Sequence, residues 1–122
     1  MPKLVIDEKC EEEIEGIEED FPDLYENVQE DLEYLEQFGF ETTVPGSNLP
    51  PETSTLTSGK YDGKIKYIRS NHGNDIFRVY FFLIGDFVVC LLGWVKKQDD
   101  IPNRILTNIE SRCEKWIDYS RS

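Results

Sequence analysis

Apolar residues recur at the spacing of an amphipathic helix through the first forty residues of the chain. Asp7 begins the pattern and is a suitable N-cap, and the glutamates after it favour the positive end of a helix dipole. Pro22 is expected to interrupt this helix, and Gly39 is expected to end a second one. The positions expected to face inward are Cys10, Ile14, Ile17, Phe21, Leu24, Val28, Leu32 or Asp31, Leu35 and Phe38. The pattern predicts an acidic helical hairpin over residues 7–39.

The second half of the chain has the alternation of apolar and polar residues that is typical of strands. Antiparallel strands are expected within residues 60–97, with a turn-rich loop at 70–75. The expected strand ranges are 64–69, 76–84 and 87–96. Gly85 and Asp86 form a two-residue hairpin signal between the last two strands. Residues 3–6 form a short apolar run that predicts an edge strand.

Two further segments complete the expected order of elements. Residues 41–59 are rich in proline, threonine and small polar residues, which predicts an extended surface connection. Residues 100–119 predict a C-terminal helix, capped by Asp99 or Asp100 and with Pro102 in its first turn. The inward positions of this helix are Ile105, Ile109, Cys113 and Trp116. This order of helices and strands predicts an α+β layer architecture.

The predicted hairpin also assigns side chains to the two faces of the sheet. A turn at residues 85–86 places Arg78 opposite Gly93, and alternation then determines the rest. One face is expected to hold Arg78, Tyr80, Phe82, Val89, Leu91, Gly93, Val95 and, if the strand continues, Lys97. The opposite face is expected to hold Phe77, Val79, Phe81, Leu83, Val88, Cys90, Leu92, Trp94 and Lys96. An arginine so placed needs an anionic partner, from the protein or from a ligand, and the glycine is expected to leave room for it.

Size and charge limit the range of functions. The 122 residues, 39% of them hydrophobic, predict a single domain over residues 1–122. A formal net charge of −12 by itself argues against a protein that binds nucleic acid. Residues 1–59 hold 17 acidic and two basic residues, a net of −15, whereas residues 60–122 hold 8 acidic and 11 basic residues, a net of +3. An anionic ligand is therefore expected at the second half, while the acidic half is either a solvated helical surface or a surface that receives a basic partner.

Several classes of protein do not fit the composition. The chain has one histidine and three cysteines far apart in the sequence, so we expect no disulfide framework, no metal site and no cofactor. No apolar run is long enough to span a bilayer, and the first residues do not resemble a signal peptide. These features predict a cytoplasmic protein with reduced thiols.

Five short stretches of the second half fall in an order typical of a known family. They read KIKYIR at 64–69, NHGN at 71–74, IFRV at 76–79, GD at 85–86 and LLGWVKK at 91–97. Over residues 56–117 this order resembles the core of the RelE/HigB toxin superfamily, and most closely its phage-derived HigB-like branch. The resemblance implies an N-terminal helical hairpin packed on a small antiparallel sheet, followed by a C-terminal helix.

The resemblance also implies a function. Members of this superfamily are toxins of type II toxin–antitoxin systems, which enter the ribosome and cleave mRNA without a metal, and a helix-turn-helix antitoxin holds them inactive. The ribose 2′-hydroxyl attacks the adjacent phosphate, and basic side chains orient the phosphate and offset the developing charge. The cations that match the family pattern in this chain are Arg69, Arg78 and Lys97.

Other residues receive supporting roles in this hypothesis. The lysines expected to attract RNA are Lys64, Lys66 and Lys96. His72 is a candidate acid or base because an unperturbed histidine titrates near neutrality, but its Asn-His-Gly-Asn setting also suits a simple turn. Arg78 could likewise pair with an acid of the first two helices instead of a phosphate.

A second hypothesis belongs to a different functional class. Tyr67 stands where the HigB-like branch commonly has an acidic residue, and residues 98–100 replace a threonine-rich link by Gln-Asp-Asp. Together with the acidic first half, these departures motivate a catalytically inactive toxin-fold module that binds a basic protein partner. The chain could form a homodimer under either hypothesis.

Overall fold

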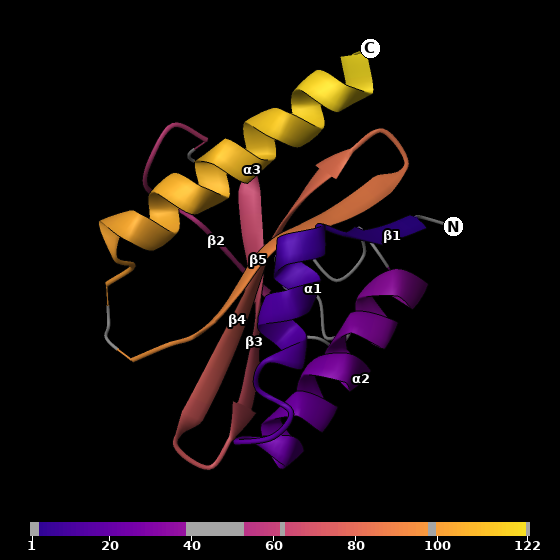
Figure 1. Cartoon of the computed structure of the whole chain (residues 1–122). Coiled ribbons are helices and arrows are strands. Elements are labelled where there is room, and N and C mark those ends of the chain that lie inside the picture. Colours follow the sequence, from indigo (N-terminus) through magenta and orange to yellow (C-terminus); the bar gives the residue numbers. More distant parts are fainter. Residues whose placement is uncertain (1–2, 39–52, 62, 98–99, 122) are drawn as a thin grey trace.

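The computed structural model describes residues 3–38, 53–61, 63–97 and 100–121. These described residues form five strands and three helices, shown in Figure 1. In chain order they are β1 (Lys3–Ile6), α1 (Glu8–Glu15), α2 (Pro22–Phe38), β2 (Thr53–Thr55), β3 (Ile65–His72), β4 (Asp75–Ile84), β5 (Phe87–Val95) and α3 (Asn103–Arg121). The predicted α+β class, with a C-terminal helix, is confirmed.

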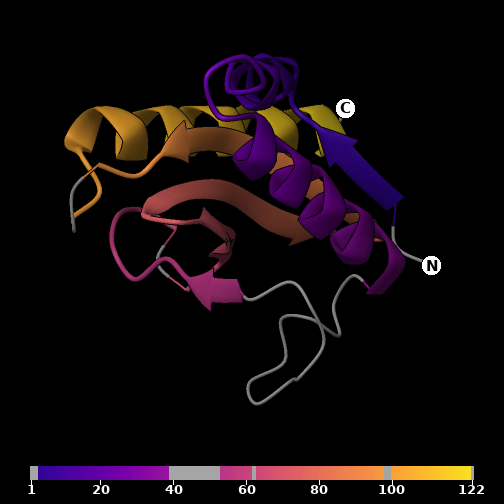
Figure 2. The same cartoon turned by 90° about the horizontal axis from the view of Figure 1, so that it is seen from below.

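The strands make one sheet with the order β1-β5-β4-β3-β2. β1 runs parallel to β5 and the other pairs are antiparallel, so the sheet is mixed rather than wholly antiparallel as expected. α1 and α2 pack on one face and α3 packs on the other, which gives three layers (Figure 2). Each face of the sheet therefore has its own hydrophobic core, and this arrangement explains why both faces are apolar at the centre.

The N-terminal helices bury the face that their spacing predicts. Asp7 is the N-cap of α1, and its side chain accepts a hydrogen bond of 2.9 Å from the Lys9 N–H. α1 ends at Glu15, earlier than the pattern predicts, because the chain tightens after Gly16 into bonds between residues three apart. Ile17 is nevertheless buried, so the predicted row of buried residues continues beyond the end of α1.

Two segments expected to be loops contain strand residues. β2 lies inside the segment 41–59, much of which falls outside the described residues, and it pairs with β3. β3 continues to His72, which pairs with Asp75 across a two-residue turn. Gly73 in this turn has a φ of +61°, a conformation that glycine adopts readily. The loop expected at 70–75 is therefore a tight hairpin.

α3 begins at Asn103, so Pro102 precedes the helix rather than lying in its first turn. The Pro102 carbonyl accepts hydrogen bonds of 3.0 Å from the N–H groups of both Ile105 and Leu106. Gly39 and Asp99, which were expected at helix ends, lie outside the residues that the structure describes.

The predicted hairpin between β4 and β5 forms. Its register shifts by one residue between Phe81 and Tyr80. The first four pairs follow the prediction, up to Phe81 opposite Cys90. The next pair joins Tyr80 to Leu92, so Leu91 is the extra residue of a β-bulge.

The bulge exchanges the two faces of β5 beyond it. Arg78 lies opposite Trp94, not opposite Gly93. A Cβ atom on Gly93 would lie 2.6 Å from the ring of Phe77, so protein atoms fill the space that was expected to admit a ligand. The predicted faces are therefore wrong for residues 92–96.

An ion pair covers the edge of β5 beside the bulge. β1 pairs only with the first part of β5, which leaves the next backbone groups with no neighbouring strand among the described residues. Arg112 donates to the Leu91 carbonyl at 2.9 Å, and the Glu13 carboxylate accepts from the Gly93 N–H at 3.2 Å. Arg112 also binds both oxygens of Glu13, at 2.8 and 3.0 Å. The pair thus satisfies the exposed backbone groups and joins α1 to α3 across the sheet edge.

A second polar contact between these helices is buried at Asp7, whose residue is 0% exposed. The carboxylate oxygen that does not cap α1 accepts hydrogen bonds from Lys115 Nζ at 2.6 Å and Trp116 Nε1 at 2.8 Å. Burial alone would raise the pKa of Asp7, but the hydrogen bonds from Lys115, Trp116 and Lys9 outweigh it, so the pKa lies below the ordinary 3.8. The ionised carboxylate therefore stabilises the fold at neutral pH.

Asp7→Asn is expected to lower the free energy of unfolding by roughly 2 kcal/mol at neutral pH. Because the folded-state pKa is depressed, this contribution is present above the unfolded-state pKa and is lost as the pH falls through the folded-state value. Urea unfolding at about pH 7 and about pH 3 should show the gap between variant and wild type narrowing in acid. Asp118→Asn, at an exposed position of α3, is the control and should show almost no gap. A gap of equal size at both pH values would contradict the assignment.

Candidate anion-binding site

Two arginines lie side by side on the face of the sheet that α3 partly covers. Arg69 in β3 and Arg78 in β4 are cross-strand partners, so their side chains leave the same face, and both are half-buried. Two guanidinium groups on one face of a sheet attract anions, which makes the pair a candidate site for a phosphate or a carboxylate.

Two tyrosines contact the Arg78 guanidinium, and Trp94 contacts one of these tyrosines. It lies 4.5 Å from the centroid of the Tyr67 ring, and its Nη1 donates to the Tyr80 hydroxyl at 3.2 Å. Trp94 Nε1 lies 3.4 Å from the same hydroxyl, and the two tyrosine rings are 5.1 Å apart. Arg78 Nε is buried without a hydrogen-bond partner among the described residues. No carboxylate of the described residues pairs with Arg78, so the acids of the first two helices do not neutralise it there.

The bulge also determines which lysine lies on the same face of the sheet as Arg78 and Trp94. The Lys96 N–H donates to the Ile76 carbonyl at 2.8 Å, so Lys96 extends the strand pairing two residues beyond Trp94. By alternation Lys96 continues the row of Arg78 and is half-buried, whereas Lys97 is exposed beyond the end of β5. Lys97 was expected to share the face of Arg78, and the structure gives that place to Lys96.

The other predicted site residues lie elsewhere. His72 is directed to α2, where its Nε2 is 3.4 Å from Asp23 Oδ2, and both side chains are exposed. Lys66 lies on the same face as His72 and donates to Thr55 Oγ1 at 3.2 Å. Lys64 is exposed before β3 and lines a hollow beside the C-terminal part of α3. The predicted residues that share one face are Arg69, Arg78 and Lys96.

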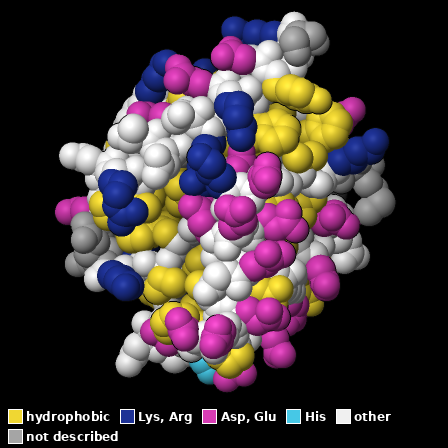
Figure 3. Space-filling model, viewed as in Figure 1, with side chains coloured by type: hydrophobic (Ala, Val, Ile, Leu, Met, Phe, Trp, Pro, Cys, Tyr) yellow, Lys and Arg dark blue, Asp and Glu magenta, His cyan; other side chains and the backbone are white. Residues whose placement is uncertain are grey.

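Surface charge divides as the two halves of the sequence do. Figure 3 shows Asp and Glu side chains gathered over α1 and α2, while Lys and Arg side chains lie mainly over the upper and left parts of the view. A polyanion that approaches the acidic helices is repelled, and one that approaches the upper and left parts of this view meets cations.

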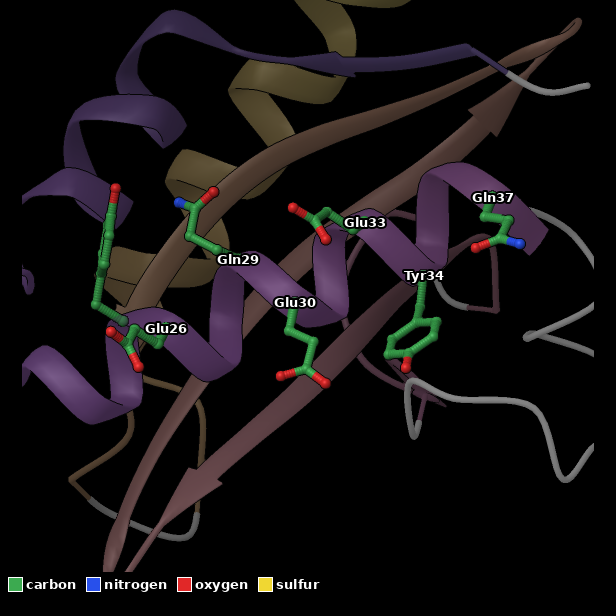
Figure 4. A pocket seen from close by; sticks show the side chains of 7 residues that line it. Glu26, Gln29, Glu30, Glu33, Tyr34 and Gln37 are labelled. Atoms are coloured by element: carbon green, nitrogen blue, oxygen red, sulfur yellow. The ribbon is translucent and has the colours of Figure 1, made fainter.

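The outer face of α2 forms a separate, acidic hollow of about 500 Å³ (Figure 4). Among the described residues, those that line it come from this helix, and they are Tyr25, Glu26, Gln29, Glu30, Glu33, Tyr34 and Gln37. On the inner side of the same helix, Asp31 accepts a hydrogen bond of 2.6 Å from Ser70 Oγ. Burial raises the pKa of Asp31, and the charge of Glu30 adds to this rise, which the Ser70 bond only partly opposes.

The described residues carry no nucleophilic thiol and no metal-binding cluster. Burial raises the pKa of Cys90 to about 12 and that of Cys113 to about 11, and it also raises the pKa of Cys10, so all three thiols stay protonated. No group of three or more His, Cys, Asp and Glu side chains in the described part could hold a metal ion. None of its helices combines the length and apolar character needed to span a bilayer.

Tyr67 and Trp94 are the residues of this site that the sequence pattern did not assign to it. A two-residue turn at Gly73 and Asn74 would predict the place of Tyr67, because the turn sets the register of β3 against β4. No residue type near Leu91 signals the bulge that brings Trp94 to this face.

Comparison with known protein families gives a match over more than half of the chain. Residues 19–114 match the family model described as phage derived protein Gp49-like (DUF891). The matched region runs from just before α2 into α3 and includes every residue of the candidate site. No curated protein and no solved structure matches the chain.

Proposed function

The chain belongs to the Gp49-like family of phage-derived proteins, which is related to the RelE/ParE-like toxins, and we propose that it is the toxin of a toxin–antitoxin system. Its proposed activity is that of a RelE/HigB-like endoribonuclease, which cleaves mRNA on the ribosome without a metal. The α+β fold and the cations on one face of the sheet support this proposal.

The observation that carries the proposal is the state of Arg78. Arg78 is half-buried on the face shared with Arg69, its guanidinium interacts with the Tyr67 ring and the Tyr80 hydroxyl, and no carboxylate of the described residues forms a salt bridge with it. A buried cation without a carboxylate partner is unfavourable unless an anion arrives. A phosphodiester supplies that anion, and arginine can bind it through two parallel hydrogen bonds.

In the proposed reaction the protein supplies electrostatic stabilisation. The ribose 2′-hydroxyl attacks the adjacent phosphorus and gives its proton to water, while the bond to the 5′-oxygen breaks and that oxygen takes a proton from water. A 2′,3′-cyclic phosphate forms, and negative charge builds on the phosphate oxygens during the attack. Arg78 and Arg69 offset this charge, and Lys96 lies along the same row to bind a neighbouring phosphate. His72 is directed to the other face of the sheet and is given no step in this reaction.

The proposal names three partners. The substrate is mRNA positioned in the ribosome, which places the activity in the cytoplasm. A helix-turn-helix antitoxin, encoded next to this chain, is the proposed inhibitor.

Induction of the wild-type chain in bacteria is expected to arrest growth, because cleavage of mRNA on the ribosome stops translation. Optical density should level off after induction, and expression of the adjacent antitoxin should restore it. Immunoblotting of the soluble fraction is the control for expression. Unchanged growth with abundant soluble chain would contradict the proposed activity.

Lys96→Ala is expected to slow mRNA cleavage by roughly tenfold, and Lys97→Ala by much less. The reason is the bulge, which places Lys96 in the row of Arg78 and leaves Lys97 exposed beyond the strand. Single-turnover cleavage rates of the two variants give the comparison. A larger loss in Lys97→Ala would show that the catalytic row follows the register without the bulge.

One observation favours the second candidate function, a toxin-fold module that binds a basic protein. The outer face of α2 presents three glutamates and two tyrosines around a single hollow (Figure 4). Under this function, Glu26→Gln combined with Glu30→Gln weakens partner binding, while Arg78→Ala has no effect. The endoribonuclease predicts the reverse sensitivity.

A further inference from the structure

The Arg78 guanidinium is held in place by two tyrosines that carry no charge. We infer that Tyr67 and Tyr80 are positioning residues that fix this guanidinium for anion binding while leaving its positive charge intact. The inference rests on the proposed function in which Arg78 binds a phosphate of RNA. It assigns roles to two residues whose types gave no reason to select them.

Tyr80 fixes the distance of the guanidinium from the sheet. Its side chain is fully buried at the centre of β4, so the hydroxyl has a set position. Arg78 Nη1 donates to this hydroxyl at 3.2 Å, and Trp94 Nε1 lies 3.4 Å from it on the next strand. Two donors directed to one oxygen use its lone pairs, so the hydroxyl acts toward both as an acceptor.

Tyr67 fixes the plane of the guanidinium. Its ring lies 4.5 Å from the guanidinium carbon and 5.1 Å from the Tyr80 ring, so ring and hydroxyl hold Arg78 from two directions. A cation over an aromatic face gains attraction from the ring quadrupole and keeps its full charge. A carboxylate at position 67 would instead form a salt bridge and cancel the local positive potential.

This arrangement has a consequence for the free protein. Arg78 is ordered before any ligand binds, so binding a phosphate there costs less side-chain entropy than binding to a mobile arginine. Its Nε is buried without a partner among the described residues, so the contacts made by those residues do not use all of its donors.

The first test is spectroscopic and needs no RNA. The ¹⁵N heteronuclear NOE of Arg78 Nε–Hε is expected to be high in the wild type and in Tyr67→Phe, which keeps the ring. It is expected to fall clearly in Tyr67→Leu and in Tyr80→Phe. Tyr34→Leu, on the outer face of α2, is the matched control and should change nothing. An Arg78 signal that stays unchanged in both Tyr67→Leu and Tyr80→Phe would overturn the inference.

The second test measures binding of a short single-stranded RNA as a function of salt. Tyr67→Glu is expected to weaken binding by roughly tenfold or more and to reduce the slope of log K against log salt by about one, as Arg78→Ala does. If Tyr67→Glu binds RNA as tightly as the wild type while Arg78→Ala binds weakly, the claim that position 67 must be uncharged is overturned. If Arg78→Ala itself binds RNA normally, the proposed function fails at this residue, and the NOE result still decides whether the tyrosines position the guanidinium.

Discussion

Arg78→Ala is expected to abolish the growth arrest that the wild-type chain causes. The substitution removes the cation that lies at the centre of the site, between Arg69 on one strand and Trp94 on the other. Loss of one preorganised donor to a developing oxyanion typically lowers the rate constant by about 10²–10³. Such a loss should leave enough intact mRNA for translation. Colonies of the variant should therefore form at a level of induction at which the wild-type chain prevents colony formation.

The fold should tolerate this change. Arg78 makes no salt bridge with a carboxylate of the described residues, so its removal leaves no carboxylate there without a partner. Arg121→Ala, at the exposed end of α3, is the matched control and should leave growth arrest intact. Persistent arrest by Arg78→Ala, with a melting temperature like that of the wild type, would show that the activity lies elsewhere.

The largest loss of stability is expected from Arg112→Leu, which should lower the free energy of unfolding by about 3 kcal/mol. The variant leaves the Glu13 carboxylate without its bidentate partner and the Leu91 carbonyl without a donor. The Arg112 side chain is 12% exposed and that of Glu13 is 32% exposed, so solvent compensates only part of this loss. Urea denaturation of the variant and the wild type measures the difference.

A double-mutant cycle separates the ion pair from the backbone contacts. Glu13→Leu combined with Arg112→Leu should lower the free energy of unfolding by much less than the sum of the two single changes. The reason is that the double variant leaves no unpaired charge at this site. Some loss should remain, since the Leu91 carbonyl and the Gly93 N–H still lose their partners at the bulge. Fully additive effects would contradict the account of Glu13 and Arg112 as one unit.

Local patterns predicted the fold well where neighbours in sequence decide it. The spacing of Ile14, Ile17, Leu24 and Val28 predicted the buried helix faces, because helical periodicity depends only on nearby residues. The turn at residues 85–86 predicted the start of the last hairpin for the same reason.

Long-range contacts explain what sequence patterns did not predict. The bulge at Leu91 depends on Glu13 and Arg112, which come from helices far away in the chain and satisfy its backbone groups. Both faces of β5 are apolar at this point, so a shift of one residue leaves no trace in the hydrophobic pattern. The sequence pattern therefore could not predict which face Trp94 lies on, or that Lys96 rather than Lys97 lies in the row of Arg78.

The central claim is that Arg78 acts on mRNA within the ribosome, and a cleavage assay tests it most directly. Purified chain is added to ribosomes programmed with a defined mRNA, and primer extension locates any cut. The account predicts cleavage by the wild type on intact ribosomes, none on the same mRNA without ribosomes, and a rate lower by about 10²–10³ for Arg78→Ala. Intact mRNA with the wild-type chain, or equal cleavage by Arg78→Ala, would contradict it.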